Sequence, residues 1–154
     1  MSSKNDLLAI WHSGVAAVQG RSSVNSALAA HQITRPDFVI AAGKAAASMA
    51  AAVHDTFGKI PTLIVTKYGH TEDAPKHAIV VQSAHPVPDE ASLAGGAAIQ
   101  DAISKCEKDA HLLFLVSGGA SSLAEVLPAG MTLNDLTLET EILLASGKDI
   151  HAMN

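Results

Sequence analysis

Short, mainly apolar runs alternate along the chain with segments in which apolar residues recur at helical spacing. A run with few polar residues is typical of a strand that is covered on both faces, as in a parallel sheet. The predicted strands are Phe38–Ala42, Thr62–Thr66, Ala78–Val81 and Leu112–Val116. The predicted helices run from Asp6 to about Val18, over Ser23–His31, from the Gly43-Lys44 pair to about Asp55, over Glu90–Glu107, shortly before Leu123, and from Thr132 to about Ala145. This alternation predicts an α/β fold with a parallel sheet and right-handed crossovers.

The end of the chain bears on the domain organisation. The stretch from Ser146 to Asn154 reads as a turn that leads into a new helix. A short frayed tail is one interpretation, but a domain does not normally end while an element opens. We therefore expect residues 1–154 to form an incomplete α/β domain, a Rossmann-like parallel sheet flanked by helices, in which the first two helices pack on the rest.

Composition narrows the class of protein. The 154 residues match one ordinary domain, and 48% hydrophobic residues suffice for a single core. Aromatic residues make up only 3%, and the net charge is −5 with His neutral, so a nucleic-acid partner is not expected. The single cysteine, Cys106, allows no intramolecular disulfide and is expected to pack in the core. No bilayer-spanning stretch or signal-peptide core is visible, so we expect a cytoplasmic protein without a membrane partner.

The strand predicted at Leu112–Val116 runs directly into a loop of small and hydroxyl-bearing residues. That loop consists of Ser117, Gly118, Gly119, Ala120, Ser121 and Ser122. In open α/β sheets, ligands bind beyond the carboxyl ends of the strands, where backbone N–H groups face an anion. The loop lacks both the G-x-G-x-x-G dinucleotide fingerprint and the G-x-S-x-G nucleophile elbow. It therefore predicts a phosphate or carboxylate site, although a flexible connection is the simpler interpretation.

A second strand-end loop carries a charge. Gly43 and Lys44 follow the strand Phe38–Ala42 and open a helix, so the Lys44 ammonium could add a point charge to the backbone donors around a phosphate. The segment is not a Walker A loop, because Phe38 and Ala45 stand where that motif needs Gly and Ser or Thr. Two such loops at neighbouring strand ends favour a ligand.

Other polar residues follow the strands without a motif of their own. His85 can donate to a substrate oxygen or secure a turn, and Asp89 is the expected N-cap of the helix that starts at Glu90. Lys67 and His70 either line the same sheet edge or are solvated. No pair of histidines has the spacing of a zinc site.

Together, these segments form a recognisable series. It comprises G-K-A-A at Gly43–Ala46, V-T-K-Y-G-H at Val65–His70, H-P-V-P-D-E-A-S at His85–Ser92, the Ser117 loop, L-P-A-G at Leu127–Gly130 and L-L-A-S-G-K-D-I at Leu143–Ile150. The series closely resembles the N-terminal part of the glycerate 2-kinase family, whose members have also been labelled hydroxypyruvate reductases. Each motif is weak alone, but their ordered combination is specific.

The resemblance implies a function and a set of site residues. It implies phosphorylation of D-glycerate at its 2-hydroxyl by ATP with Mg²⁺, in a cleft between two domains, with glycerate and nucleotide as partners. Lys44 would be catalytic. Substrate or phosphate would be bound by Gly43, Ser117, Gly118, Gly119, Ser121, Ser122, His85 and Asp89. Neither the metal ligands nor the oligomeric state follows from the sequence, and a homo-oligomer is compatible with it.

The chain also departs from the family pattern. Ala120 replaces the common third glycine of the loop, which restricts the backbone there. The family continues beyond Asn154 with a basic motif and a second domain, so we expect these 154 residues alone to have little or no activity. A noncatalytic module that binds small anions or nucleotides is an alternative, and a hydroxypyruvate reductase is another, although the missing dinucleotide fingerprint argues against it.

Overall fold

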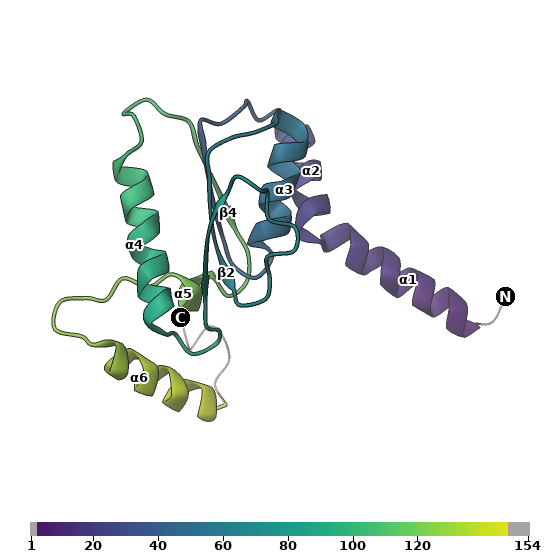
Figure 1. Cartoon of the computed structure of the whole chain (residues 1–154). Helices are drawn as coiled ribbons and strands as arrows, with labels where there is room; N and C mark the ends of the chain where they lie inside the picture. Colours follow the sequence, from purple (N-terminus) through teal and green to yellow (C-terminus); the bar gives the residue numbers. More distant parts are fainter. Residues whose placement is uncertain (1–2, 148–154) are drawn as a thin grey trace.

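The computed structural model describes residues 3–147, and its centre is a four-stranded parallel sheet (Figure 1). The strands are β1 (Phe38–Ala42), β2 (Thr62–Lys67), β3 (Ile79–Ser83) and β4 (Leu112–Val116), in the spatial order β3-β2-β1-β4. Each neighbouring pair is parallel. All four strands predicted from the apolar runs are confirmed; β2 ends one residue later than predicted, and β3 begins one residue later and ends two residues later.

The helices lie on both faces of this sheet. They are α1 (Ser3–Val18), α2 (Gly20–His31), α3 (Ala46–Phe57), α4 (Glu90–Ser104), α5 (Ala120–Leu123) and α6 (Leu133–Ala145). Helices α2 and α3 cover one face, and α4 with the short α5 covers the other (Figure 1). The predicted α/β fold is therefore confirmed. The helix expected to open near the C-terminus falls largely on 148–154, outside the described residues.

The two central strands hold the core because both of their faces are covered. Val39 and Ala41 of β1 and Ile64 of β2 pack with the helices α2 and α3. Leu63 and Val65 point the other way and pack against α4 and α5. Since successive side chains of a strand face opposite sides, only an uninterrupted apolar run satisfies both layers.

Small residues bring α4 close to the segment that follows α5. A Cβ atom built on Gly95 would lie 2.7 Å from the carbonyl oxygen of Leu123, and one on Gly96 would overlap the backbone of Glu125. The Glu125 N–H donates to the carbonyl of Ser92 at 2.9 Å. Gly95 and Gly96 therefore permit a backbone approach that any larger residue would prevent.

The first helix departs from expectation. We predicted that α1 packs on the domain, but none of its residues is buried, and it projects from the body (Figure 1). Its apolar side chains are open to solvent, with Trp11 60% and Ile10 70% exposed. Within 3–147, no helix is both long enough and apolar enough to cross a bilayer.

Candidate functional site

The carboxyl ends of the parallel strands bring four separate segments to one edge of the sheet. Ala42 of β1 pairs with Val65 of β2 on one side and with Val116 of β4 on the other. On the far side of β2, Lys67 pairs with Ser83 of β3. Because all strands run in the same direction, the loops that follow them meet at this edge, where open α/β sheets bind their ligands.

The loops after β1 and β4 are hydrogen-bonded to each other. The Ser117 N–H donates to the Ala42 carbonyl at 2.9 Å, and the Lys44 N–H donates to the Gly118 carbonyl at 3.1 Å. The Ser117 hydroxyl accepts from the Ala45 N–H at 3.0 Å. The positions 43–45 and 117–118, more than 70 residues apart in sequence, thus form one structural unit. In this arrangement the Ser117 hydroxyl helps to start α3.

Gly43 is the crossing point of this unit. Its φ is 117°, a conformation that side-chain-bearing residues rarely adopt, and a Cβ atom there would overlap the Ser117 carbonyl and hydroxyl. Its carbonyl accepts from the buried Thr66 hydroxyl at 2.9 Å. Gly43 therefore serves the close passage of two chain segments.

Lys44, His85 and Gly119 meet in the same place. A Cβ atom on Gly119 would lie 2.6 Å from Cδ2 and 2.7 Å from Nε2 of His85, and 3.4 Å from Cε of Lys44. The Lys44 stem also passes 3.9 Å from such an atom on Gly118. The imidazole and the lysine stem thus lie on the glycine pair that the sequence singled out.

The remaining loop residues lie just beyond that glycine pair. Ala120 begins α5, Ser121 is exposed, and the Ser122 hydroxyl donates to the Gly119 carbonyl at 3.3 Å. Helix α5 is a single turn and lacks a side-chain cap. Ser121 is thus the more available hydroxyl of the two for a ligand.

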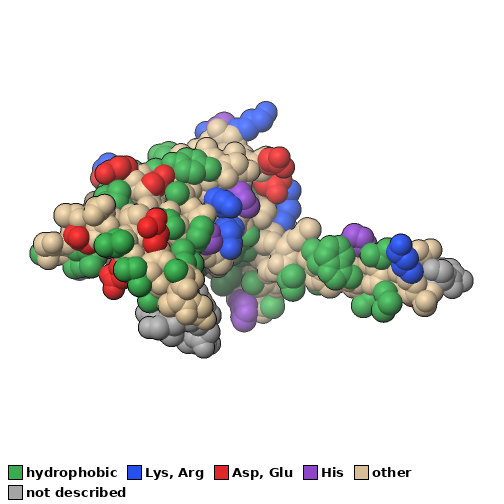
Figure 2. Space-filling view, turned by 90° about the horizontal axis from the view of Figure 1, so that it is seen from below, with side chains coloured by type: hydrophobic (Ala, Val, Ile, Leu, Met, Phe, Trp, Pro, Cys, Tyr) green, Lys and Arg blue, Asp and Glu red, His purple; other side chains and the backbone are tan. Residues whose placement is uncertain are grey.

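Positive charge gathers around His85. Partial burial lowers the pKa of its imidazole, and the charges of Lys44 and Lys67 lower it further. The imidazole is therefore neutral at neutral pH and can accept or donate a proton. Figure 2 shows Lys or Arg side chains beside His side chains near the middle of one face.

Asp89 is the N-cap of α4, as the sequence predicted. It begins α4 with a capping box, in which its carboxylate accepts from the Ser92 N–H at 3.0 Å. The same carboxylate accepts from the Tyr68 hydroxyl at 2.8 Å and the Ala84 N–H at 3.3 Å. Partial burial by itself raises the pKa of Asp89, but these hydrogen bonds outweigh it and hold the pKa below its usual range.

We expect Asp89→Ala to lower the free energy of unfolding by about 1–2 kcal/mol at neutral pH, because the helix loses its cap and Tyr68 loses its partner. The lowered pKa makes this stabilisation present above the unfolded-state pKa of about 3.9 and lost as the pH falls below it. Urea unfolding of both proteins measures the difference. Ser104→Ala, which removes an exposed hydroxyl that donates to the Asp101 carbonyl at the other end of α4, is the control and should show a difference that does not depend on pH. A difference that stays constant from neutral pH to about pH 3 would contradict the assignment.

A polar cavity of about 310 Å³ lies beside Lys44. It is lined by Lys44, Ala47, Ser48, Gly69, His70, Glu72 and Asp73. His70 Nδ1 lies 3.2 Å from the Lys44 carbonyl, which ties the segment after β2 to this edge. The cavity leaves room for a polar ligand directly next to the lysine.

The next question is whether the residues of this site could bind Mg²⁺. The described part of the chain has no cluster of three or more His, Cys, Asp or Glu side chains able to hold a metal. Mg²⁺ in phosphoryl-transfer sites needs only one or two carboxylates, with phosphate oxygens and water as the other ligands. Glu72 and Asp73 in the cavity beside Lys44 are compatible with that donor set.

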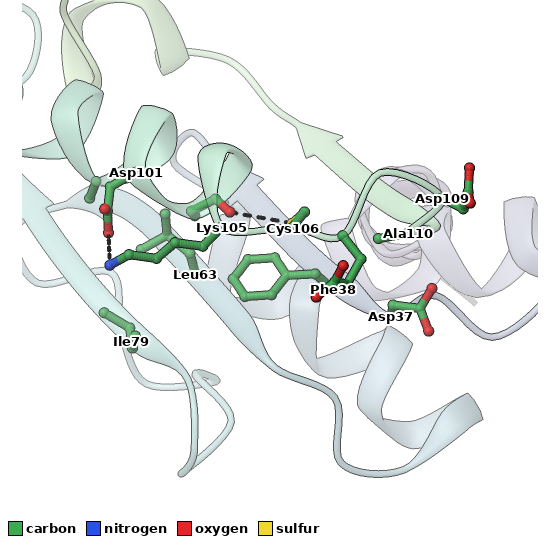
Figure 3. Close-up of a pocket in the computed structure, with 12 residues that line it drawn as sticks. Asp37, Phe38, Leu63, Ile79, Asp101, Lys105, Cys106, Asp109 and Ala110 are labelled. Carbon is green, nitrogen blue, oxygen red and sulfur yellow. Dashed lines mark hydrogen bonds and ion pairs between the residues drawn. The ribbon is translucent and has the colours of Figure 1, made fainter.

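A larger cavity of about 680 Å³ lies at the opposite edge, where the strands begin (Figure 3). Its wall includes Phe38 and Ile79, the first residues of β1 and β3. Lys105 in its rim forms an ion pair with Asp101 at 2.7 Å. Cys106, which we expected in the core, also lines it and is only partly buried. Since the wall is apolar and its lysine is already paired, this cavity does not have the properties of an anion site.

Sequence reasoning missed two contributors to the edge. Tyr68 and Thr66 lie in the V-T-K-Y-G-H segment, yet their hydroxyl partners, Asp89 and Gly43, are 21 and 23 residues away. No local pattern indicates such pairings. The order of the motifs at successive strand ends was the available signal.

Comparison with known proteins finds relatives that carry two names, glycerate 2-kinase and hydroxypyruvate reductase. A family model described as "Domain of unknown function (DUF4147)" matches residues 6–154. A protein named glycerate 2-kinase from Pyrococcus horikoshii is 38% identical over 117 residues, which cover 76% of this chain and 26% of that protein. A D-glycerate 2-kinase from Thermotoga maritima is 36% identical, covering 75% and 28%, and a putative hydroxypyruvate reductase from Agrobacterium vitis is 40% identical, covering 75% and 30%.

Solved structures agree with these relatives. The crystal structure of a glycerate kinase from Thermotoga maritima has a TM-score of 0.80 and 32% identity, covering 97% of this chain and 37% of that one. A crystal structure from Pyrococcus horikoshii has a TM-score of 0.78 and 30% identity, with coverage of 98% and 37%. The chain thus spans between 26% and 30% of the length of the curated relatives described above.

Proposed function

The chain belongs to the DUF4147 family, the N-terminal domain of glycerate kinases, and from that premise we propose that it serves the ATP-dependent phosphorylation of D-glycerate to 2-phosphoglycerate. The observation that carries the proposal is the meeting of Lys44, His85 and the Gly118-Gly119 pair at the carboxyl edge of the sheet. A cation, a neutral imidazole and backbone groups at one strand edge suit a reaction in which negative charge moves between oxygens.

The reaction transfers a phosphoryl group between two anionic substrates, ATP and glycerate. The 2-hydroxyl oxygen of glycerate forms a bond to the γ-phosphorus of ATP, the bond from that phosphorus to the bridging oxygen breaks, and ADP leaves. Lys44 would stabilise the charge on the transferring phosphoryl group, and the Gly118-Gly119 backbone would approach it closely. The neutral imidazole of His85 can receive the hydroxyl proton. Bound Mg²⁺ would neutralise phosphate charge, with Glu72 and Asp73 as available carboxylates.

The proposed reaction is not expected of these 154 residues acting alone. Phosphoryl transfer requires that both substrates and their charges be positioned at the same time. The relatives named glycerate 2-kinase are much longer than the matched region. We therefore expect the 154-residue chain to bind ligand weakly and to show little or no turnover.

Incubation of the purified complete gene product with ATP, Mg²⁺ and D-glycerate should yield ADP and 2-phosphoglycerate. Phosphorus NMR distinguishes this product from 3-phosphoglycerate and so tests the position as well as the transfer. A reaction without D-glycerate measures background ATP hydrolysis. A properly folded gene product that consumes no ATP in response to glycerate would refute the assignment.

Reduction of hydroxypyruvate is the second candidate, because the Agrobacterium vitis relative carries that name. The loops after β1 and β4 both lack the G-x-G-x-x-G fingerprint of nicotinamide binding. Oxidation of NADH or NADPH on addition of hydroxypyruvate would support this candidate. Calorimetry that detects glycerate or nucleotide binding without turnover would favour the third one, a noncatalytic anion-binding module.

A further inference from the structure

Lys67 lies at the carboxyl end of β2, the strand between the one that leads to Lys44 and the one that leads to His85. In the sheet order β3-β2-β1-β4, β2 has on one side β1, which leads to Lys44, and on the other β3, which leads to His85. Lys67 is the last residue of β2 and pairs with Ser83, two residues before His85. It is half-buried, whereas most charged residues here are exposed.

The backbone around Lys67 is held in place. The Thr66 hydroxyl donates to the Gly43 carbonyl at 2.9 Å, and the Tyr68 N–H donates to the Ser83 carbonyl at 3.2 Å. The His70 N–H donates to the Lys67 carbonyl at 3.1 Å. Bonds to β1 and β3 on either side therefore determine where this lysine stem starts.

Within residues 3–147, the ammonium groups of Lys67 and Lys44 have no direct partner, although Glu72 and Asp73 line the same cavity as Lys44. Among residues 3–147, neither side chain takes part in a hydrogen bond or an ion pair. Asp89, the carboxylate at the start of α4, already accepts hydrogen bonds from Tyr68, Ala84 and Ser92. Two cations without a direct partner at one strand edge can bind an anion that lies between them, because opposite charges attract.

We propose that Lys67 is a second anion-binding cation of this site, and that Lys44 and Lys67 together flank His85 to hold a ligand with two separate anionic groups. This inference rests on the proposed function, in which 2-phosphoglycerate carries a carboxylate and a phosphate on adjacent carbons. Lys44 takes the phosphoryl group and Lys67 the carboxylate. The neutral His85 between them then faces the oxygen at C2, where the proton is lost.

The groups that surround His85 support this division of roles. Lys44 belongs to the loop after β1 and Lys67 to the end of β2, and the charges of both lower the pKa of His85 in addition to burial. The loop after β4 contributes the uncharged Gly119, which touches the ring. At the start of α4, the Tyr68 hydroxyl and the Asp89 carboxylate are hydrogen-bonded to each other. The two charged groups that shift the pKa of His85, Lys44 and Lys67, are therefore both cations.

The test compares Lys67→Met with Lys76→Met in the complete gene product. Both variants lose one positive charge, but Lys76 is exposed in the loop before β3 and does not act on His85. We expect Lys67→Met to weaken 2-phosphoglycerate binding by about tenfold in calorimetry, and inorganic phosphate binding by about threefold at most. Lys76→Met should change neither, and Lys67→Arg should restore most of the 2-phosphoglycerate affinity.

A second measurement does not depend on any activity. Histidine NMR titration, with His85 assigned by His85→Gln, should show a higher pKa of His85 in Lys67→Met than in the wild type, and an unchanged one in Lys76→Met. An unchanged His85 pKa in Lys67→Met would overturn the proposal. So would a wild type that binds neither probe, or equal losses for 2-phosphoglycerate and phosphate. If selective 2-phosphoglycerate binding depends on Lys67 but the complete gene product transfers no phosphate, the proposed function fails and the second cation stands.

Discussion

Lys44→Met is expected to lower the rate of 2-phosphoglycerate formation by about 10²–10³-fold in the complete gene product, because it removes the cation that we propose stabilises the transferring phosphoryl group. The Lys44 stem lies over Gly118 and Gly119, with its Cε 3.4 Å from the position of a Cβ atom on Gly119. Methionine keeps an unbranched apolar stem of similar length there. Steady-state kinetics with varied ATP and D-glycerate measures the loss.

The control for this variant is Lys59→Met. Lys59 is exposed in the turn before β2, at the amino end of the strand whose carboxyl end faces the site, and its side chain has no partner among the described residues. It removes the same charge, so a general electrostatic effect would appear in both variants. A Lys44→Met enzyme with more than a third of the wild-type kcat would exclude a catalytic role for this lysine.

Gly43→Ala is expected to lower the free energy of unfolding by about 3 kcal/mol or more, the largest stability effect that we predict. Two causes add up. A φ of 117° is unfavourable for any residue with a Cβ atom, and that atom would overlap the Ser117 carbonyl and hydroxyl, which the backbone bonds on both sides hold in place. Urea unfolding followed by circular dichroism measures the change.

Gly130→Ala separates the two causes. Gly130 also has a positive φ, 88°, but a Cβ atom there would meet nothing within 4 Å. Its replacement should therefore cost only about 1 kcal/mol, the conformational part. If both alanine variants lose the same stability, the crossing of the two loops does not constrain Gly43 as the structure indicates.

The positions of the strands could be predicted from the sequence, because a strand buried on both faces is a continuous run of mainly apolar residues. Ile40 and Ile64 are fully buried at the centres of runs with few polar residues, and those runs became β1 and β2. The start of α4 was predictable for a similar reason, since Asp89 bonds to Ser92 only three residues away. Features whose cause lies within a few residues can be read directly.

The packing of helix α1 could not be predicted from the sequence. Leu7, Trp11 and Val15 recur at helical spacing, and the helix exists, but the expected packing does not. Apolar periodicity indicates which side of a helix can be buried, yet it does not identify a surface to cover it. Whether a helix packs is decided by its neighbours in space.

The candidate site, too, has features that could be predicted from the sequence and features that could not. The sequence by itself determined that Lys44, His85 and the Ser117 loop follow three different strands, and that parallel strands would bring them to one edge. Only the tertiary structure decided that Gly119 lies against His85, that the Ser117 hydroxyl accepts from the Ala45 N–H at the start of α3, and that Lys67 pairs with Ser83, two residues before His85. Periodicity and caps depend on contacts within one or two turns, whereas these contacts join residues up to 72 positions apart, and their geometry depends on the register and packing of the whole sheet.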